Sequence, residues 1–325
     1  MKVSVIVPVY NVEDFLGRCL DSLIEQTYQD YEIICINDCS PDNSAEILNS
    51  YQDKYPDLIK VFHNQENMGL GKTREKALSL ANGDYILFVD SDDYVKSDYI
   101  SSYTRALKED DYDIVIGGYI RDIAGKKTVH LLSDSVWSSV TYAIACAKLF
   151  KKSFIINNGL KFTGVSCGED IYFSLSAYYC GARTKIIDYA GYYYYYNSNS
   201  ITGSMDYKKN HEQIMSELFS TFLANYDLKA LPEDNQRVIE YVYLANMINA
   251  LFVFNRGCGI RLMKKKLEFA RKDASEKFPN YESNPYIGLR KPKGQTLKIR
   301  LGVGVTMFLK KMHLDAIPFY LSALL

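Results

Sequence analysis

Short apolar segments alternate with helix-like segments through the first third of the chain, and this alternation constrains the fold more than any other feature. Apolar runs predict buried strands at 3–9, 32–36, 59–62, 85–89 and 113–116. Helical periodicity predicts helices at 13–26, 71–81 and 97–107, with one more opened by the capping residues Ser40-Pro41-Asp42. Strands joined by short links through helices indicate a mainly parallel sheet between helix layers. This is an α/β architecture of the nucleotide-binding type, but a fold alone does not define a function.

After Gly118 the pattern is looser. We expect helices at 142–150 and 170–180, and one or two strands at 186–196, where five consecutive tyrosines stand. Further helices are predicted at 214–222, 238–254 and 262–270. A boundary near Gly203 to Asp206 would separate an α/β domain of residues 1–205 from a mostly helical region of residues 206–325.

The charge is balanced over the whole chain but not along it. The net charge is −1, whereas residues 256–311 carry fifteen Lys or Arg against four Asp or Glu, a local charge of +11. An acidic body with a basic end suggests that this end binds a surface. The seven cysteines are scattered without a C-x-x-C pair, which favours reduced thiols in a cytosolic protein. The chain enters a strand at once rather than a signal peptide, and it has no run of 18 apolar residues, so we expect no membrane span.

An acidic cluster follows the strand predicted at 85–89. Asp90 and Asp92, two residues apart on an extended segment, point to the same side and can converge on one divalent cation or one sugar diol. Two other strands end in polar residues, Tyr10-Asn11 and Asn37-Asp38. Because the carboxyl ends of parallel strands lie along one edge of a sheet, these groups can face a common crevice. Solvated turns at strand ends are the plainer alternative.

Four sequence blocks carry a resemblance to a known family. They are Val5-Ile6-Val7-Pro8-Val9-Tyr10-Asn11, Ile36-Asn37-Asp38-Cys39-Ser40, Asn67-Met68-Gly69 with Arg74, and Gly83-Asp84-Tyr85 running into the acidic cluster. Together, in this order and spacing, they resemble the family 2 glycosyltransferases of the GT-A fold. The resemblance covers about the first 100 residues, and the ordered set is far more specific than any single block.

The resemblance implies a site for a nucleotide-sugar donor. Pro8 and Tyr10 would flank the base, typically uracil, and Asp38 would accept a hydrogen bond from its N–H group. Gly69 and Arg74 would lie near the donor.

The resemblance also implies a metal ion, Mn²⁺ or Mg²⁺, at a DXD motif. Asp90 would bind ribose hydroxyls or the metal shell, and Asp92 would be the protein ligand of the metal. A divalent cation stabilises the negative charge that develops on a departing diphosphate, and hard oxygen ligands suit such an ion. No role is assigned to Asp93.

A second region extends the resemblance toward an acceptor. Lys148-Leu149-Phe150, Phe162 and the stretch from Gly168 to Phe173 are similar to the acceptor-side segment of the family. Asp170 would be the general base that deprotonates the acceptor hydroxyl, and Glu169 would help to position the acceptor. A plain N-terminal helix cap is the alternative for this acidic pair. Residues 194–202 resemble a strand and loop that closes over the site, although a tyrosine-rich strand needs no function.

The implied activity is that of an inverting, metal-dependent glycosyltransferase. It would move a hexosyl or N-acetylhexosaminyl group from a nucleotide-sugar, most simply a UDP-sugar, to a hydroxyl of a glycan or lipid-linked acceptor in surface polysaccharide synthesis. A non-catalytic nucleotide-sugar or glycan-binding protein of the same fold is the alternative, but Asp38, Asp92 and Asp170 are all present. A nucleotidyltransferase would need a glycine- and arginine-rich signature at the first strand, which Pro8 to Asn11 is not.

The basic end joins lysine clusters to apolar stretches at 301–309 and 316–325, which are too short to span a bilayer. They can lie in the interface beside anionic headgroups, which would place a cytoplasmic protein on the inner face of the membrane. A helical bundle with a solvated basic face is the alternative. Nucleic-acid binding is not expected, because aromatic residues are not interleaved with the charges.

Overall fold

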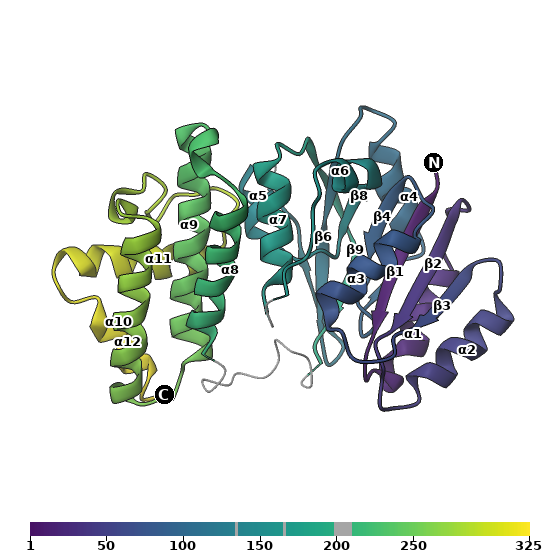
Figure 1. Ribbon diagram of the computed structural model, residues 1–325, viewed down its shortest axis with the longest axis horizontal. Coiled ribbons are helices and arrows are strands. Elements are labelled where there is room, and N and C mark those ends of the chain that lie inside the picture. The colour runs from purple at the N-terminus through teal and green to yellow at the C-terminus, as the bar shows by residue number, and fades with distance from the viewer. Residues whose placement is uncertain (134–135, 165–166, 198–209) are drawn as a thin grey trace. The chain divides into compact units, whose positions relative to one another are not determined.

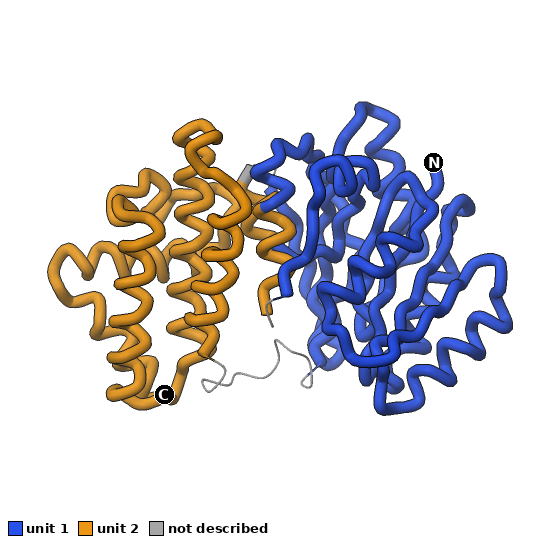
Figure 2. The backbone as a smooth tube through the Cα atoms, in the orientation of Figure 1, with its two compact units in different colours: residues 1–134, 143–164, 176–197 blue, residues 135–142, 165–175, 198–325 orange. Residues whose placement is uncertain are grey.

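The computed structural model describes residues 1–133, 136–164, 167–197 and 210–325. The chain divides into two compact units, one of residues 1–134, 143–164 and 176–197 and one of residues 135–142, 165–175 and 198–325 (Figure 2). The first unit holds the sheet, and the described part of the second is helical. The boundary predicted at Gly203 to Asp206 lies outside the described residues, so the division into 1–205 and 206–325 stays a prediction.

The described strands of the first unit form a single nine-stranded sheet (Figure 1). Its order is β3-β2-β1-β4-β8-β6-β9-β5, with β7 paired to β6 outside this path. The first four strands are parallel to one another, β8 runs antiparallel between β4 and β6, and β9 is parallel to β6. The strand bounds are β1 Val3–Val9, β2 Tyr31–Asn37, β3 Ile59–His63, β4 Tyr85–Phe88, β5 Tyr94–Val95, β6 Ile114–Ile123, β7 Lys126–His130, β8 Lys148–Lys151 and β9 Thr184–Tyr195.

Helices of the first unit cover the sheet with their apolar faces. In α1, Leu16, Cys19, Leu20 and Leu23 are buried, as the helical spacing predicts. Right-handed crossovers put α1 and α2 on one face, and α3, which leads back past β1 to β4, on the other. The helix bounds are α1 Glu13–Ile24, α2 Ser44–Lys54, α3 Leu70–Leu80, α4 Tyr99–Ala106 and α6 Lys152–Asn157.

Most predicted elements are confirmed, and one is wrong. Residues 142–150 do not form a helix: a turn is followed by strand β8, which pairs with both β4 and β6. A short apolar run is compatible with either a strand or a helix, and here two neighbouring strands supply hydrogen-bond partners that the sequence pattern does not reveal.

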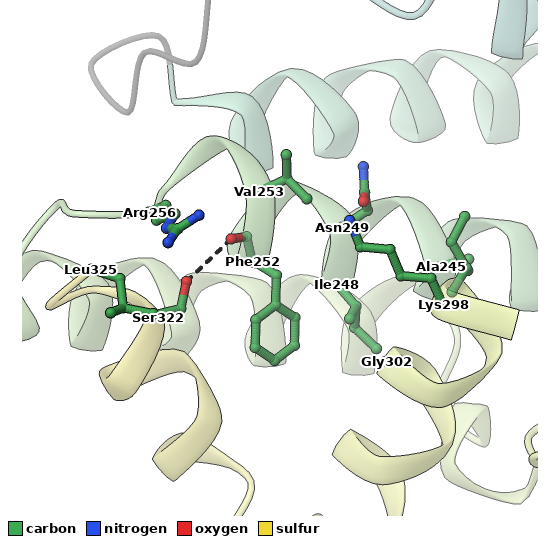
Figure 3. A pocket seen from close by; sticks show the side chains of 11 residues that line it. Ala245, Ile248, Asn249, Phe252, Val253, Arg256, Lys298, Gly302, Ser322 and Leu325 are labelled. Carbon is green, nitrogen blue, oxygen red and sulfur yellow. Dashed lines mark hydrogen bonds between the residues drawn. The ribbon is translucent and has the colours of Figure 1, made fainter. Parts of the chain in front are cut away.

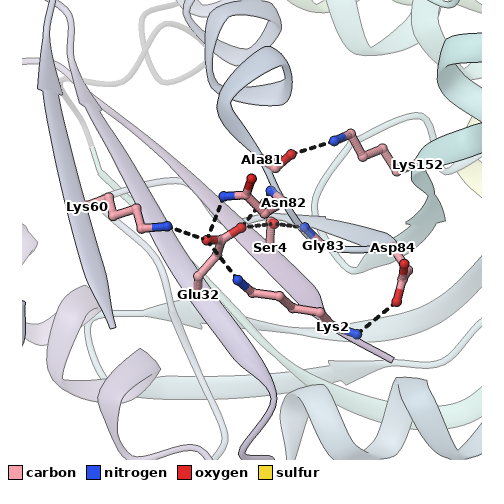
Figure 4. A network of polar contacts seen from close by, with 9 residues as sticks. All are labelled: Lys2, Ser4, Glu32, Lys60, Ala81, Asn82, Gly83, Asp84 and Lys152. Carbon is pink, nitrogen blue, oxygen red and sulfur yellow. Dashed lines mark hydrogen bonds and ion pairs between the residues drawn. The ribbon is translucent and has the colours of Figure 1, made fainter. Parts of the chain in front are cut away.

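A buried carboxylate fixes the amino-terminal edge of the sheet (Figure 4). Glu32 is 2% exposed and lies 2.8 Å from Lys60 and 3.2 Å from Lys2. It also accepts hydrogen bonds from the Ser4 hydroxyl at 2.7 Å and from the Asn82 backbone N–H at 2.7 Å. Burial raises the pKa of Glu32, but the hydrogen bonds led by Lys60 and Ser4 outweigh it and lower the pKa to about 2.

The second unit is a bundle whose core is rich in aromatic side chains, including Phe219, Phe222, Tyr241 and Tyr243. The helix Glu233–Phe254, made of α9 and the π-helix η3, is long and apolar enough to cross a membrane. It was found among the described residues only, and 67% of its apolar window is buried, as in the core helix of a bundle. The bounds are α5 Val136–Thr141, α7 Glu169–Tyr179 (shared between the units), α8 His211–Asn225, η2 Leu228–Ala230, α9 Glu233–Asn249, η3 Ala250–Phe254, α10 Ile260–Lys277, η4 Tyr281–Ser283, α11 Leu297–Lys311 and α12 Ala316–Ser322.

Candidate functional site

The carboxyl ends of β2, β1 and β4 are neighbours at the point where the strand order reverses. Val9 at the end of β1 is opposite Asn37 at the end of β2, while β1–β4 pairing stops at Ile6 and Phe88. Open α/β sheets bind ligands in the crevice at such a switch point. Several of the predicted site residues lie on or directly after these three strand ends.

The end of β1 offers one buried and one exposed predicted residue. Pro8 is buried within the strand, whereas Tyr10, which follows it, is 48% exposed. Asn11 has a left-handed backbone, with φ at 53°, and its N–H donates to the Ser40 hydroxyl at 3.2 Å. The exposed ring of Tyr10 is therefore available to stack on a flat ligand.

Asp38 is buried and ties the loop before α3 to the end of β2. Its Oδ1 accepts hydrogen bonds from Asn64 Nδ2 at 2.7 Å and from the Met68 N–H at 2.8 Å, and its Oδ2 accepts one from the Gly69 N–H at 2.9 Å. Gly69 has φ at 83°, a conformation that glycine adopts without strain. Asp38 thus positions Gly69, and its Oδ2 keeps acceptor capacity for a further donor.

Arg74 and Asp90 form an ion pair that joins α3 to the end of β4. Arg74 is 1% exposed and its Nη2 lies 2.8 Å from Asp90 Oδ1. The guanidinium also lies over the rings of Phe88 and Phe162, at 5.8 and 5.4 Å. Asp90 itself is 29% exposed, so its other oxygen can reach a ligand.

Asp92 is held from both sides, by Arg18, which the sequence did not single out, and by Asn197, which belongs to the segment 194–202 expected at the site. Its carbonyl oxygen accepts from Arg18 Nη2 at 2.8 Å, and its Oδ2 accepts from Asn197 Nδ2 at 3.2 Å. The Arg18 guanidinium lies over the rings of Tyr94 and Tyr195, at 4.6 and 4.2 Å. Burial, together with the nearby charge of Asp90, raises the pKa of Asp92.

Asp93, which had no assigned role, anchors the acidic cluster to strand β9. It is 1% exposed, and its oxygens accept from the Tyr192 hydroxyl at 2.5 Å and from the Tyr195 N–H at 2.7 Å. The Tyr192 hydroxyl also accepts from the Asp90 N–H at 3.2 Å. The tyrosine-rich strand therefore supports the acidic turn. Residues 198–202 of the predicted closing loop lie outside the described residues.

Glu169 and Asp170 occupy the first turn of α7, as predicted, and belong to the second unit. Gly168 precedes them with φ at 95°, and its carbonyl accepts from the Ile171 N–H at 2.9 Å. A Cβ at this glycine would meet the side chains of Leu218 and Met215, at 2.9 and 3.0 Å. Carboxylates in the first turn of a helix are favoured in their ionised form by the positive end of the dipole.

The donor set at the acidic turn suits a hard cation. Among the described residues no group of three His, Cys, Asp or Glu side chains converges on one point. However, Mg²⁺ and similar ions are commonly held by one or two carboxylates together with the oxygens of a bound phosphate. Asp92, with Asp90 beside it, offers carboxylates whose mutual repulsion a cation would relieve.

Carboxylates at neighbouring strand ends beside the switch point of a parallel sheet are typical of nucleotide-binding α/β proteins. Residues 4–166 match the family model "Glycosyl transferase family 2". The chain belongs to this family.

Similar proteins agree with this assignment. Poly(ribitol-phosphate) beta-glucosyltransferase of Bacillus spizizenii is 33% identical over 277 residues, which are 82% of this chain and 42% of that protein. The uncharacterized glycosyltransferase EpsJ of Bacillus subtilis is 34% identical over 242 residues, 69% of this chain and 70% of that one. The chain thus spans less than half of the first relative's length.

A solved structure of residues 1–349 of TarS from S. aureus, in complex with UDP, has the same fold. It superposes with a TM-score of 0.68 at 23% sequence identity, covering 99% of this chain and 90% of that chain. The first unit accordingly has the GT-A fold expected from the sequence.

Proposed function

We propose that this chain is an inverting glycosyltransferase that moves a sugar from a nucleotide-sugar, most simply a UDP-sugar, to a hydroxyl of a glycan or lipid-linked acceptor. The observation that carries the proposal is the set of carboxylates of Asp38, Asp90 and Asp92 at neighbouring strand ends of a family 2 chain. The relatives named as poly(ribitol-phosphate) glycosyltransferases support a role in surface polysaccharide synthesis and a hexosyl or N-acetylhexosaminyl group. UDP in the TarS structure supports the choice of nucleotide.

In this proposal the donor binds at the switch-point crevice. Pro8 and the exposed Tyr10 flank the base, and Asp38 Oδ2 accepts from its N–H. Asp90 binds ribose hydroxyls through the oxygen that does not face Arg74. Gly69 and Arg74 shape the crevice near the diphosphate.

The proposed chemistry is a single displacement. Asp170 takes the proton of the acceptor hydroxyl while its oxygen bonds to the anomeric carbon, and the bond from that carbon to the diphosphate oxygen breaks. Attack from the face opposite the leaving group inverts the configuration, and Glu169 positions the acceptor. Asp92 is the proposed ligand of Mn²⁺ or Mg²⁺, which supplies positive charge for the departing diphosphate.

The test is nucleotide release from a panel of nucleotide-sugars with Mn²⁺ or Mg²⁺. Asp170→Asn is expected to lower kcat by roughly 10²- to 10⁴-fold, with Asp188→Asn, exposed on β9, as the matched control. Undiminished turnover in Asp170→Asn would remove the base assignment. If UDP raises the melting temperature but no sugar is transferred from any donor, the non-catalytic binding protein is favoured instead.

Metal dependence has its own test. We expect EDTA to abolish turnover and Mn²⁺ to restore it, and Asp92→Asn to weaken Mn²⁺-dependent stabilisation by UDP in a thermal shift assay. Asp53→Asn, which changes an exposed residue of α2, is the control. Activity indifferent to EDTA would overturn the metal part alone.

We also propose that the protein works in the cytoplasm at the inner face of the membrane, where a lipid-linked acceptor would be presented. The free state of all seven cysteines and the basic C-terminal region support this location.

A further inference from the structure

The outer face of α11 carries a continuous apolar stripe exposed to solvent. Its members recur every three or four residues and are 57%, 40%, 42%, 64% and 53% exposed: Leu297, Leu301, Val305, Phe308 and Met312. On a helix of 3.6 residues per turn they fall within about 80° of arc. Scattered exposed apolar residues are ordinary, but a stripe along one whole helix face marks an interaction surface.

Positive charge borders this stripe. With a rotation of about 100° per residue, Lys298 lies just beyond one edge of the arc and Lys311 lies beyond the other edge. Both lysines are exposed. Between Glu282 and Asp315 the sequence holds seven Lys or Arg residues and no Asp or Glu. Neither Lys298 nor Lys311 forms an ion pair with any described residue, so their charges are available to a partner.

A pocket of about 510 Å³ adjoins the same helix (Figure 3). Lys298 and Arg256 contribute positive charge to its lining, and the remainder is mainly apolar, with Ile248, Phe252 and Leu325 among its members. The pocket and the stripe both combine apolar surface with positive charge. An anionic amphiphile, which has an apolar body and a negatively charged head, is complementary to both.

We propose that α11 is a membrane-docking helix, which lies in the interface of an anionic bilayer with the stripe in the acyl boundary and Lys298 and Lys311 at the headgroups. An amphipathic helix with apolar residues on one face and lysines at its edges has the chemistry for this position. The inference narrows the membrane contact proposed above to one face of one helix. Vesicle binding needs neither donor nor acceptor, so its failure leaves the sugar-transfer proposal standing.

A second copy of the chain is a poorer occupant of this surface. Two α11 stripes in contact would bring their bordering lysines together, and this part of the sequence has no acidic side chain to neutralise them. An anionic bilayer supplies the missing negative charge, which attracts basic residues near its surface.

The test is co-sedimentation of the full chain with vesicles of phosphatidylglycerol and phosphatidylcholine, compared with phosphatidylcholine alone. We expect binding to the anionic vesicles that falls with added salt. Leu301→Ser with Phe308→Ser should reduce the vesicle partition coefficient at least tenfold. Ile156→Ser on α6, a residue that is 58% exposed, is the matched control and should leave it unchanged.

The bordering charges are tested separately. Lys298→Gln with Lys311→Gln should reduce binding to anionic vesicles several-fold, whereas Lys264→Gln with Lys265→Gln, which are also exposed but lie on α10, should have a much smaller effect. Circular dichroism confirms that each variant is folded. Absence of binding at low salt, or equal losses in both lysine pairs, would overturn the proposal. Concentration-dependent self-association in light scattering, abolished by Phe308→Ser, would assign the stripe to a second copy instead.

Discussion

Glu32 shows how a buried charge can be stabilising. The carboxylate is 2% exposed, but the lysines that pair with it, Lys2 and Lys60, are 38% and 41% exposed. The pair therefore keeps part of its hydration, and the hydrogen bonds from Ser4 and Asn82 occupy the remaining lone pairs.

The low pKa of Glu32 predicts a pH dependence of stability. The folded protein holds this carboxylate ionised down to about pH 2, whereas the unfolded chain takes up a proton near its ordinary pKa of 4.5. The stabilisation is complete above that upper value and is lost as the pH falls through the window between the two. Glu32→Gln should lower the free energy of unfolding by about 2 kcal/mol at pH 7, and the difference should shrink at pH 3. Urea denaturation followed by circular dichroism measures both.

Glu46→Gln, an exposed change on α2, is the control and should stay within about 0.5 kcal/mol of the unaltered protein at both pH values. A Glu32→Gln effect of the same size at pH 7 and pH 3 would contradict the lowered pKa.

Individual site residues differ in how far the sequence predicts them. The positions of Asp38, Asp90 and Asp92 at strand ends follow from short-range patterns, because a strand and its end are read locally. The support from Arg18 could not be predicted, since Arg18 meets Asp92 only through the packing of α1. The segment 194–202 was expected at the site, but the sequence does not reveal that its Asn197 contacts Asp92. The role of Asp93 cannot be predicted from the sequence for the same reason: its partners are about 100 residues away in sequence.

The turn that leads into β4 depends on a close approach of two backbones. A Cβ at Gly83 would lie 2.5 Å from the Ser4 backbone nitrogen and 2.9 Å from the Lys2 carbonyl oxygen. The Asp84 carboxylate accepts from the Lys2 N–H at 3.0 Å, which draws this turn against β1.

Gly83→Ala should therefore push the turn away from β1 and lower the free energy of unfolding by about 1–3 kcal/mol. The measurement is chemical denaturation, with the melting temperature as a second readout. Gly164→Ala is the control, since a Cβ there meets nothing within 4 Å. Equal stability of the two variants would show that the turn can move at no cost.

A buried ion pair joins two helices of the second unit. Lys266 on α10 is 4% exposed and Glu212 on α8 is 1% exposed, with 2.9 Å between Nζ and Oε1. Asn210 and Asn255 complete the network, as partners of Lys266 and Glu212 respectively. Lys266 is thus a core residue, although it belongs to the basic end that the sequence predicts to bind a surface.

Lys266→Met should lower the free energy of unfolding by about 3–5 kcal/mol, because it leaves a buried carboxylate unpaired. Lys265→Met, at the exposed neighbouring position, should change it little. The double variant with Glu212→Gln is expected to recover part of the loss. A single variant as stable as the double one would contradict the buried pairing.

Helices and strands, like site residues, can be predicted where the local sequence pattern determines them. The strands β1 to β4 and the helices between them follow from apolar runs and helical periodicity, and their bounds agree within a few residues. Strand β8 was missed because its state depends on β4 and β6, which flank it in the sheet but not in the sequence.

Over the whole molecule, the seven cysteine thiols lie in very different surroundings. Cys39 is exposed and directly follows Asp38, three others are half-buried, and Cys19, Cys35 and Cys146 are buried. Burial raises the pKa of Cys35 to about 12, which further suppresses its thiolate.

We expect one thiol to react quickly with a disulfide reagent at pH 8 in the native protein, and all seven to react after denaturation. Cys39→Ser should remove the fast phase, and UDP should slow it if the base binds beside Asp38. A fast phase that persists in Cys39→Ser would show that another thiol is accessible.

Pro8 determines where the pairing between β1 and β4 ends. Val9 accepts from Asp38 on one side and Ile6 accepts from Val89 on the other, so the backbone of residue 8 faces β4. Proline has no N–H to offer there, and the ladder between β1 and β4 ends. A residue with a backbone N–H at this position could donate one more hydrogen bond to β4. The pairing of the two strands would then continue closer to Asp90. The missing hydrogen atom on the Pro8 nitrogen thus determines where the pairing between β1 and β4 ends.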